Sequence, residues 1–130
     1  MPTPRTRLGN RGEELARQYL ERQGYRVVAR NYRCAWGEID LVAQEGEELV
    51  FVEVRTRRGD AFGTPEESIT PAKARHLVAS AQEYLQERGP ENAPWRIDFI
   101  GIRLDPRPDQ RQEAGRSSPR IHHLKHAVEL

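Results

Sequence analysis

Residues 37–57 read GEIDLVAQEGEELVFVEVRTR, and this stretch determines the expected fold. Two apolar runs, 38–44 and 48–56, flank a two-residue loop at Gly46 and Glu47. Glycine at the first central position of such a loop is typical of a type II′ turn, which closes antiparallel hairpins. The stretch therefore predicts two adjacent strands joined by a tight turn.

The turn fixes which residues of the hairpin face each other. One face carries Ala43 with Val50, Leu41 with Val52 and Ile39 with Val54, and the other carries Val42 with Phe51, Asp40 with Glu53 and Glu38 with Arg55. A slip of one residue would place charges on the apolar face, so the register is strongly specified. Asp40 and Glu53 are then expected directly opposite each other, with Cβ atoms roughly 5 Å apart.

Two carboxylates at that separation destabilise a hairpin unless their charges are neutralised. A shared proton, a nearby arginine or a divalent cation could neutralise them, and Mg²⁺ accepts carboxylate oxygens while keeping several waters. A surface cluster in which Arg55 balances Glu38 and Glu53 is the alternative. The neighbouring valines and Phe51 indicate a partly buried site, where unneutralised charge is costly, and so favour a metal site.

The segment before the hairpin predicts a helix and a strand. Asn10 is a good N-cap with Glu13 three residues later, so the helix is expected to begin there and to end at Gly24. Residues 1–9 are expected to form a flexible arm, and residues 25–33 a first strand.

The segment after the hairpin predicts a second helix and a fourth strand. Thr70 followed by Pro71 indicates the start of the helix, and Gly89 its end. A strand is expected at 95–104, a mobile loop at 105–120, and a short strand or helical turn in the last ten residues.

The predicted order is helix, three strands, helix, strand. A strand–helix–strand crossover normally returns parallel to the strand it left, so the sheet is expected to be mixed. Residues 10–130 are expected to form a single α/β domain with helices packed on a mixed central sheet.

Composition excludes several classes of protein. No apolar run approaches the roughly 18 residues of a membrane span, and residues 1–12 contain no apolar stretch typical of a secretory signal. The single cysteine, Cys34, excludes an internal disulfide and a multi-cysteine zinc site, which fits a reducing cytoplasm.

Charge is distributed unevenly along the chain. Residues 1–33 contain eight arginines, residues 34–54 contain six acids and no base, and Arg55, Arg57 and Arg58 follow. A basic surface around an acidic centre suits a polyanion bound at a metal site, and charges that merely solvate the surface are the alternative.

The same residues resemble the YraN-like family of predicted nucleases in the PD-(D/E)XK superfamily. The matching segments are Gly9-xxx-Glu13-xx-Ala16, NYRCAWGEIDLVA at 31–43, FVEVRTR at 51–57, Phe62-Gly63-x-Pro65 and Thr70-xx-Lys73. The resemblance spans nearly the whole chain outside 105–120. It implies a restriction-endonuclease-like core with the element order predicted from the residues.

In that superfamily an aspartate on one strand and a Glu-x-Lys on the next form the site. The resemblance implies that Asp40 and Glu53 bind Mg²⁺ or Mn²⁺ with the Val54 carbonyl oxygen, and that Glu13 is a supporting helix acid. A capping box is the alternative role for Glu13. Arg55 stands where the superfamily usually has lysine; arginine supplies charge but does not act as a base, so water activation would fall to the metal.

Other charged residues receive lesser roles. Glu38 is expected to support the site by facing Arg55 rather than to bind the metal. Asp98, in an apolar strand, is assigned no role, with an arginine as a candidate partner, and the histidines at 122, 123 and 126 are expected to be ordinary surface residues. The candidate nucleic-acid contacts are Arg11, Arg57, Arg58 and Lys73, with a solvated helix face as the alternative for Lys73.

The expected function is a DNA endonuclease dependent on Mg²⁺ or Mn²⁺, with branched or damaged DNA as candidate substrates. The alternative is a nucleic-acid-binding module that keeps the fold and has lost the chemistry through Arg55. One small site cuts one strand at a time, so symmetric cleavage of two strands would need a homodimer.

Overall fold

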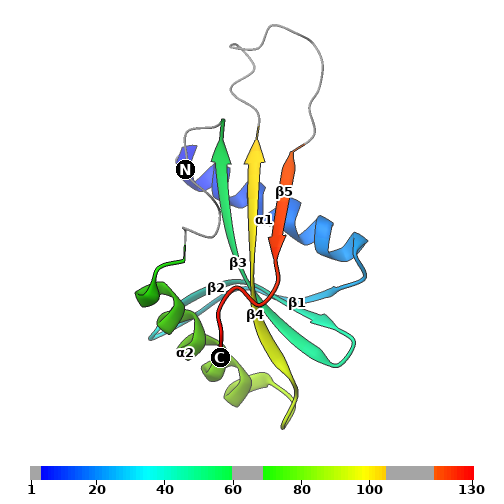
Figure 1. The fold of residues 1–130 in the computed structure, drawn as a ribbon, viewed down its shortest axis with the longest axis vertical. Helices are drawn as coiled ribbons and strands as arrows, with labels where there is room; N and C mark the ends of the chain where they lie inside the picture. Colours follow the sequence, from blue (N-terminus) through cyan, green and yellow to red (C-terminus); the bar gives the residue numbers. More distant parts are fainter. Residues whose placement is uncertain (1–3, 60–68, 105–118) are drawn as a thin grey trace, which may run out of the picture.

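The computed structural model describes residues 4–59, 69–104 and 119–130. The elements in these residues are α1 (Pro4–Arg22), β1 (Arg26–Cys34), β2 (Gly37–Glu45), β3 (Glu48–Arg58), α2 (Pro71–Arg88), β4 (Trp95–Leu104) and β5 (Arg120–Leu124). The strands form one sheet in the order β1-β2-β3-β4-β5, in which only β3 and β4 are parallel (Figure 1). This arrangement confirms the predicted α/β fold with a mixed sheet.

The first helix begins earlier than predicted. α1 starts at Pro4, so residues 4–9, expected as a flexible arm, are helical, and residues 1–3 lie outside the described residues. Proline is favourable in a first turn because the N–H that it lacks has no helical partner there. Asn10 is therefore inside the helix, and the predicted capping box with Glu13 does not form.

The β2–β3 hairpin has the predicted turn. Gly46 has a φ of +61°, whereas Glu47 does not have a positive φ, as a type II′ turn requires. The regular pairs are Glu45 with Glu48, Gln44 with Leu49, Ala43 with Val50, Val42 with Phe51 and Leu41 with Val52. The register predicted for this part of the hairpin is confirmed.

The crossover from β3 to β4 also follows the prediction. The Thr70 hydroxyl accepts a hydrogen bond from the Lys73 amide (3.1 Å), Pro71 occupies the first turn of α2, and Gly89 caps its end. β4 then runs parallel to β3, and the C-terminal segment adds β5 as an antiparallel edge strand. The predicted mobile loop falls on residues 105–118, outside the described residues, and on Pro119 and Arg120, the second of which begins β5.

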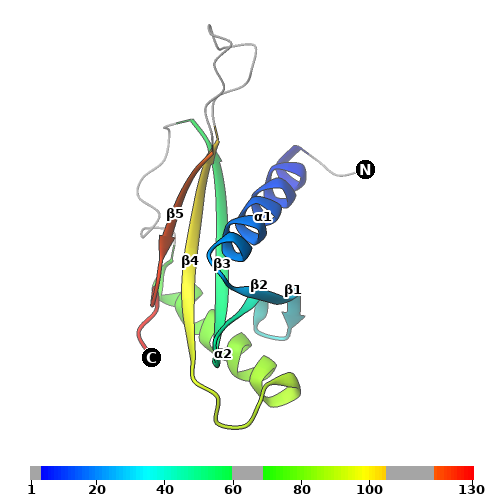
Figure 2. The same ribbon diagram turned by 90° about the vertical axis from the view of Figure 1, so that its right-hand side faces the viewer.

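The helices cover opposite faces of the sheet. α1 contributes Ala16 and Leu20 to a cluster with Leu41, Val52 and Ile100, among others. α2 contributes Leu77, Ala81 and Tyr84 to a cluster with Val42, Phe51 and Ile97, among others. Figure 2 shows the strong twist of the sheet, in which β1 and β2 turn away from the direction of β3 and β4. Because β3 contributes residues to both clusters, it is buried on both faces.

A glycine permits close approach of α1 to β3. A Cβ atom on Gly12 would lie 1.7 Å from the Thr56 Oγ1, so any side chain there would force the two elements apart. This contact places the next residue of α1, Glu13, near the open end of the β2–β3 hairpin, away from the turn. In the described part of the chain no helix is long and apolar enough to cross a membrane.

Candidate metal and phosphate site

Asp40 lies where the regular pairing of β2 with β3 stops. That pairing ends at Leu41 opposite Val52, and the Asp40 Oδ2 accepts a hydrogen bond from the Val54 amide at 2.8 Å. The Asp40 side chain thus bonds to a backbone N–H of β3 where a regular ladder would have a backbone acceptor. The predicted placement of Asp40 directly opposite Glu53 in a regular ladder is wrong in this detail, because the side chain of Asp40 bonds to the backbone of β3.

Glu53 is buried beside two cationic side chains. Only 4% of the residue is exposed, and its Oε2 lies 3.2 Å from the Lys73 Nζ and 3.3 Å from the Arg55 Nε. The Arg55 Nε makes no hydrogen bond within the described residues, so its contact with Glu53 is an ion pair without hydrogen-bond alignment. Lys73 lies in the first turn of α2, and the Thr70 cap fixes where that turn begins.

Burial and charge together make Asp40 a weak acid. Burial, together with the nearby charge of Glu53, raises the pKa of Asp40 to about 8. The hydrogen bond from the Val54 amide opposes the rise but does not cancel it. The metal-free chain therefore holds a proton on Asp40 at neutral pH, and a bound cation would stabilise the ionised form instead.

A second pair of acids flanks the first. The side chain of Asn31 lies between Glu13 and Glu38; with its amide nitrogen toward them, it donates to the Glu13 Oε1 at 3.2 Å and to the Glu38 Oε2 at 2.9 Å. Burial raises the pKa of Glu13, and the charges of Glu38 and Glu53 raise it further. Glu13 thus faces the carboxylates of the hairpin from α1.

Glu38 does not pair as predicted. Its Oε2 lies 3.6 Å from the Arg33 Nε, on the neighbouring strand β1, where Arg33 and Glu38 are register partners. The expected partner was Arg55, which instead lies against Glu53. The change follows from the end of the β2–β3 ladder at Leu41, because beyond that point β2 pairs with β1 alone.

The predicted nucleic-acid contacts lie in separate places. Lys73 reaches Glu53, whereas Arg11 is exposed on α1. Arg57 and Arg58 lie at the end of β3, and the Arg57 Nη1 donates to the Thr56 carbonyl oxygen at 3.3 Å. We call the site of Asp40 and Glu53 the carboxylate site. Lys73 is part of it and is not simply a solvated helix residue.

The donor set fits a hard divalent cation. Asp40 and Glu53 offer carboxylate oxygens, and the backbone of Val54 lies beside Asp40. Among residues 4–59, 69–104 and 119–130, no three His, Cys, Asp or Glu side chains form a cluster suited to a metal ion. A cation at this site would thus use two carboxylates and complete its shell with backbone carbonyl and water oxygens, as Mg²⁺ does.

A separate buried ionic network lies on the α1 face of β4. Asp98 is fully buried and accepts hydrogen bonds from the Arg96 Nε (2.9 Å), the His126 amide (3.1 Å) and the His123 Nε2 (2.7 Å). Because the carboxylate only accepts, the His123 Nε2 carries the proton, and the Nδ1 of a neutral ring accepts from the Tyr19 hydroxyl at 3.0 Å. His123 is therefore a buried structural residue, and its interpretation as a surface histidine was wrong.

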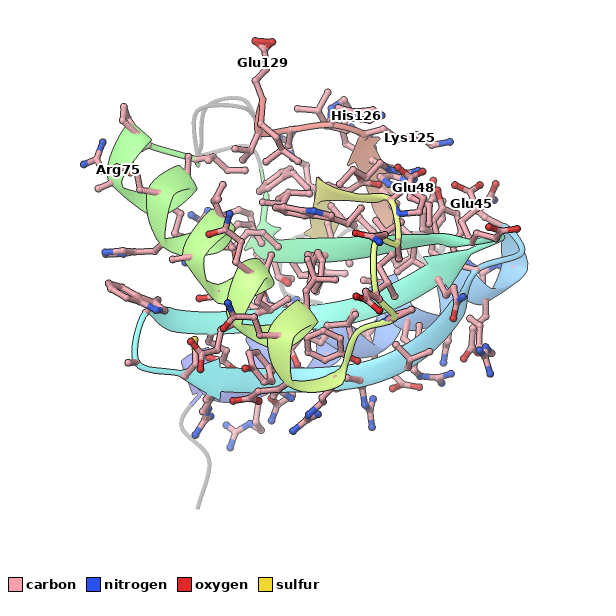
Figure 3. All side chains as sticks on the ribbon, turned by 90° about the horizontal axis from the view of Figure 1, so that it is seen from below. Glu45, Glu48, Arg75, Lys125, His126 and Glu129 are labelled. Carbon is pink, nitrogen blue, oxygen red and sulfur yellow. The ribbon has the colours of Figure 1, made fainter. Side chains whose placement is uncertain are left out.

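Arg96 connects this network to the hairpin turn. Its Nη1 donates to Glu45 and Glu48 at 3.1 and 2.6 Å, and its Nη2 donates to the Tyr25 hydroxyl at 2.8 Å. Figure 3 shows Glu45 and Glu48 beside the turn of the hairpin, at the same corner of the molecule as Lys125 and His126. One feature of the sequence indicates this network: Arg96 and Asp98 are opposite charges two positions apart in a mainly apolar strand, and so lie on the same face.

Comparison with known proteins identifies the family of this chain. Residues 12–102 match the family described as Uncharacterised protein family UPF0102. The chain belongs to the UPF0102 family. Among its relatives are UPF0102 proteins of Roseiflexus castenholzii, 49% identical over 126 residues (96% of this chain and 95% of the relative), and of Chloroflexus aurantiacus, 54% identical over 103 residues (78% and 83%). A UPF0102 protein of Geobacter sulfurreducens is 44% identical over 123 residues (95% and 89%).

The UPF0102 match contains the whole carboxylate site. It begins at residue 12, one position before Glu13, and it ends within β4. Asp98 lies inside the matched range, whereas its partner His123 lies beyond it, in β5. The buried network therefore ties the C-terminal strand of this UPF0102 chain to the part that defines the family.

The raised pKa of Asp40 predicts how the stability of the metal-free UPF0102 chain depends on pH. Between about pH 4 and pH 8 the folded chain keeps the Asp40 proton whereas the unfolded chain has released it, so the contribution of this residue to stability falls as pH rises. Asp40→Asn has no such proton. Urea unfolding in the presence of a chelator should show a parent that loses stability relative to the variant across this window, and parallel pH profiles would contradict the burial argument.

Proposed function

We propose that this chain is a divalent-metal-dependent endonuclease that cleaves DNA phosphodiester bonds at a PD-(D/E)XK-type site. The observation that carries the proposal is the convergence of a buried acid, a half-buried acid and two cationic side chains from three elements: Glu53 and Arg55 of β3, Asp40 of β2, and Lys73 of α2. Buried acids are costly to a fold without a counterion, and cations beside them suit a phosphate. The resemblance of GEIDLVA and FVEVR to the YraN-like nucleases supports the same chemistry.

Asp40 and Glu53 are the proposed ligands of Mg²⁺ or Mn²⁺, together with the Val54 carbonyl oxygen. When bound, such a cation lowers the pKa of a coordinated water and polarises the phosphate. The protein positions both carboxylates independently of the cation: the Val54 amide orients Asp40, and Lys73 orients Glu53. Glu13, held beside them through Asn31, supports the negative potential that attracts the cation.

Lys73 supplies the ammonium group that the Glu-x-Lys motif lacks in this chain. Position 55 holds arginine, yet the Lys73 Nζ reaches the same Glu53 oxygen from α2. In the proposed reaction Lys73 and Arg55 stabilise the charge that develops on the scissile phosphate, and the compact lysine ammonium lies closest to the carboxylate. The substitution at position 55 is thereby compatible with activity.

Lys73→Gln is expected to lower DNA cleavage by about 10²-fold, because it removes one positive charge aimed at the phosphate. The matched control is Lys125→Gln, which removes the other lysine of the chain, an exposed residue that follows β5, and should leave cleavage unchanged. Initial rates on a labelled substrate with Mn²⁺ measure both. Equal rates for the parent and Lys73→Gln would exclude a role of this residue in the reaction.

The activity is tested on labelled linear duplex, single-stranded and four-way branched DNA with Mn²⁺, and with chelator in parallel. The proposal predicts cleavage of at least one substrate that stops when the metal is removed. Symmetric cuts in a branched substrate would further indicate a homodimer, since one site cuts one strand. No cleavage of any substrate by a folded chain would contradict the proposal.

The second candidate function is a nucleic-acid-binding module without chemistry, which Arg55 in place of lysine favours. It predicts DNA binding whose logarithm falls linearly with the logarithm of salt concentration, and no metal-dependent cleavage. Arg55→Lys distinguishes the two functions. Cleavage by that variant alone would assign the parent to the binding class.

A further inference from the structure

Three arginines stand side by side on the neighbouring strands β3, β4 and β5. Arg57 of β3 is the register partner of Arg103 of β4, and Arg103 is the partner of Arg120 of β5. Adjacent strands lie about 4.8 Å apart, so the three backbone positions span about 10 Å. We call Arg57, Arg103 and Arg120 the arginine row.

Strand alternation places the arginine row on the face of the sheet opposite α1. On β4, Ile100 and Ile102 pack in the α1 cluster, so Arg103 points to the other face. On β5, Ile121 packs against the same cluster and His123 contacts Tyr19 of α1, so Arg120 also points away from α1. Register partners share a face, and Arg57 therefore belongs with them.

The arginine row lies on the same face as the carboxylate site. Glu53, Arg55 and Arg57 alternate along β3, and the contact of Glu53 with Lys73 shows that this face is the one toward α2. Arg55 thus lies between the arginine row and Glu53. The next register row toward the site pairs Arg55 with Gly101 and Gly101 with His122.

α2 leaves this part of the sheet face uncovered. Its buried residues pack with Val42, Phe51 and Ile97, which lie toward the other end of the strands. Figure 1 shows α2 beside that lower end, whereas the ends of β3 and β4 and the start of β5 extend away from it. Arg120 is exposed and Arg57 and Arg103 are half-buried, so their guanidinium groups lie at or near the surface.

We propose that the arginine row binds the phosphate backbone of DNA and leads it to the carboxylate site. This inference rests on the proposed function and adds a binding surface formed by β4 and β5, which the short motifs of the hairpin do not contain. Three arginines on one face of the sheet form a positive surface, which attracts a polyanion. Each guanidinium has five N–H donors, so contacts within the chain leave donors for a phosphate.

The test is the salt dependence of DNA binding by the full chain with chelator present, so that binding is measured without cleavage. Arg103→Gln and Arg120→Gln should each lower the magnitude of the slope of log affinity against log salt by about 1, and the double variant by about 2. Arg26→Gln is the matched control: it lies on β1, the opposite edge strand, where it bonds to Gln44. It should leave the slope unchanged.

The outcomes separate this inference from the nuclease proposal. A folded double variant with the slope of the parent would overturn the arginine row as a phosphate site, even if Mn²⁺-dependent cleavage is found. A reduced slope in a chain that never cleaves would support the arginine row and overturn the nuclease.

Discussion

Asp40→Asn and Glu53→Gln are each expected to lower metal-dependent DNA cleavage by about 10³-fold or more. Each replacement removes a charged oxygen ligand, and Lewis-acid stabilisation by a bound cation is worth several kcal/mol, where about 1.4 kcal/mol is a factor of ten in rate. The changes keep side-chain size, so the fold should persist. Single-turnover cleavage with saturating enzyme measures the effect on the chemical step.

The matched control for both changes is Glu47→Gln. Glu47 is an exposed acid at the turn of the same hairpin, outside the carboxylate site. It should cleave like the parent, and circular dichroism should confirm that all variants are folded. Parent-like cleavage by Asp40→Asn would exclude Asp40 as a ligand.

Asp98→Ala is expected to lower the free energy of unfolding by about 3–5 kcal/mol, the typical cost of breaking a buried ion pair from one side. It leaves Arg96, whose side chain is 5% exposed, with only the partly exposed Glu45 and Glu48 as carboxylate partners, and it removes the acceptor of His123. Urea unfolding at neutral pH measures the loss. The size of the effect follows from the burial of Asp98, Arg96 and His123.

The matched control for Asp98→Ala is Glu14→Ala, which removes an exposed ion pair of α1 with Arg17 and should change stability little. Acid should reproduce part of the Asp98 effect. Burial alone would raise the pKa of Asp98, but hydrogen bonds from His123, Arg96 and the His126 amide hold it below its ordinary value. This stability is therefore present at neutral pH and is lost as pH falls through the lowered pKa. Equal stability of Asp98→Ala and the parent at neutral pH would contradict a stabilising network.

Local signals predicted the hairpin and α2 correctly because each depends on few neighbouring residues. Gly46 alone selects the turn, and the turn fixes the register as far as Leu41 opposite Val52. Thr70 and Pro71 specify the start of α2 within two residues. Glycine accepts the positive φ that the turn requires, and proline has the φ of a first helical turn, so tertiary structure had little to change.

The start of α1 shows why the same reasoning failed elsewhere. Asn10 with Glu13 and the early Pro4 are both acceptable helix starts, and local preference does not choose between them. Packing favours the earlier start, because Leu8 in the added turns lies against the α1 cluster. Tertiary burial outweighs a capping preference of about 1 kcal/mol.

The acids of the candidate site were predictable from the sequence, whereas the contact of Lys73 with Glu53 was not. Asp40 and Glu53 stand out because each interrupts an apolar strand, whereas Lys73 is twenty residues from Glu53 and carries no spacing signal. Only the crossover of α2 brings it to the site. The same applies to His123, which reaches Asp98 across the β4–β5 pairing. Contacts set by topology are invisible to patterns that describe one element at a time.

The proposed chemistry depends on a divalent cation held by Asp40 and Glu53, and Mn²⁺ binding to the purified chain tests this most directly. Calorimetry of the parent, Asp40→Asn and Glu47→Gln at pH 8 should show one Mn²⁺ bound by the parent and by Glu47→Gln, and binding lost or weakened at least about tenfold in Asp40→Asn. Binding of Mn²⁺ with equal affinity by all three chains, or by none of them, would contradict a metal site at Asp40 and Glu53.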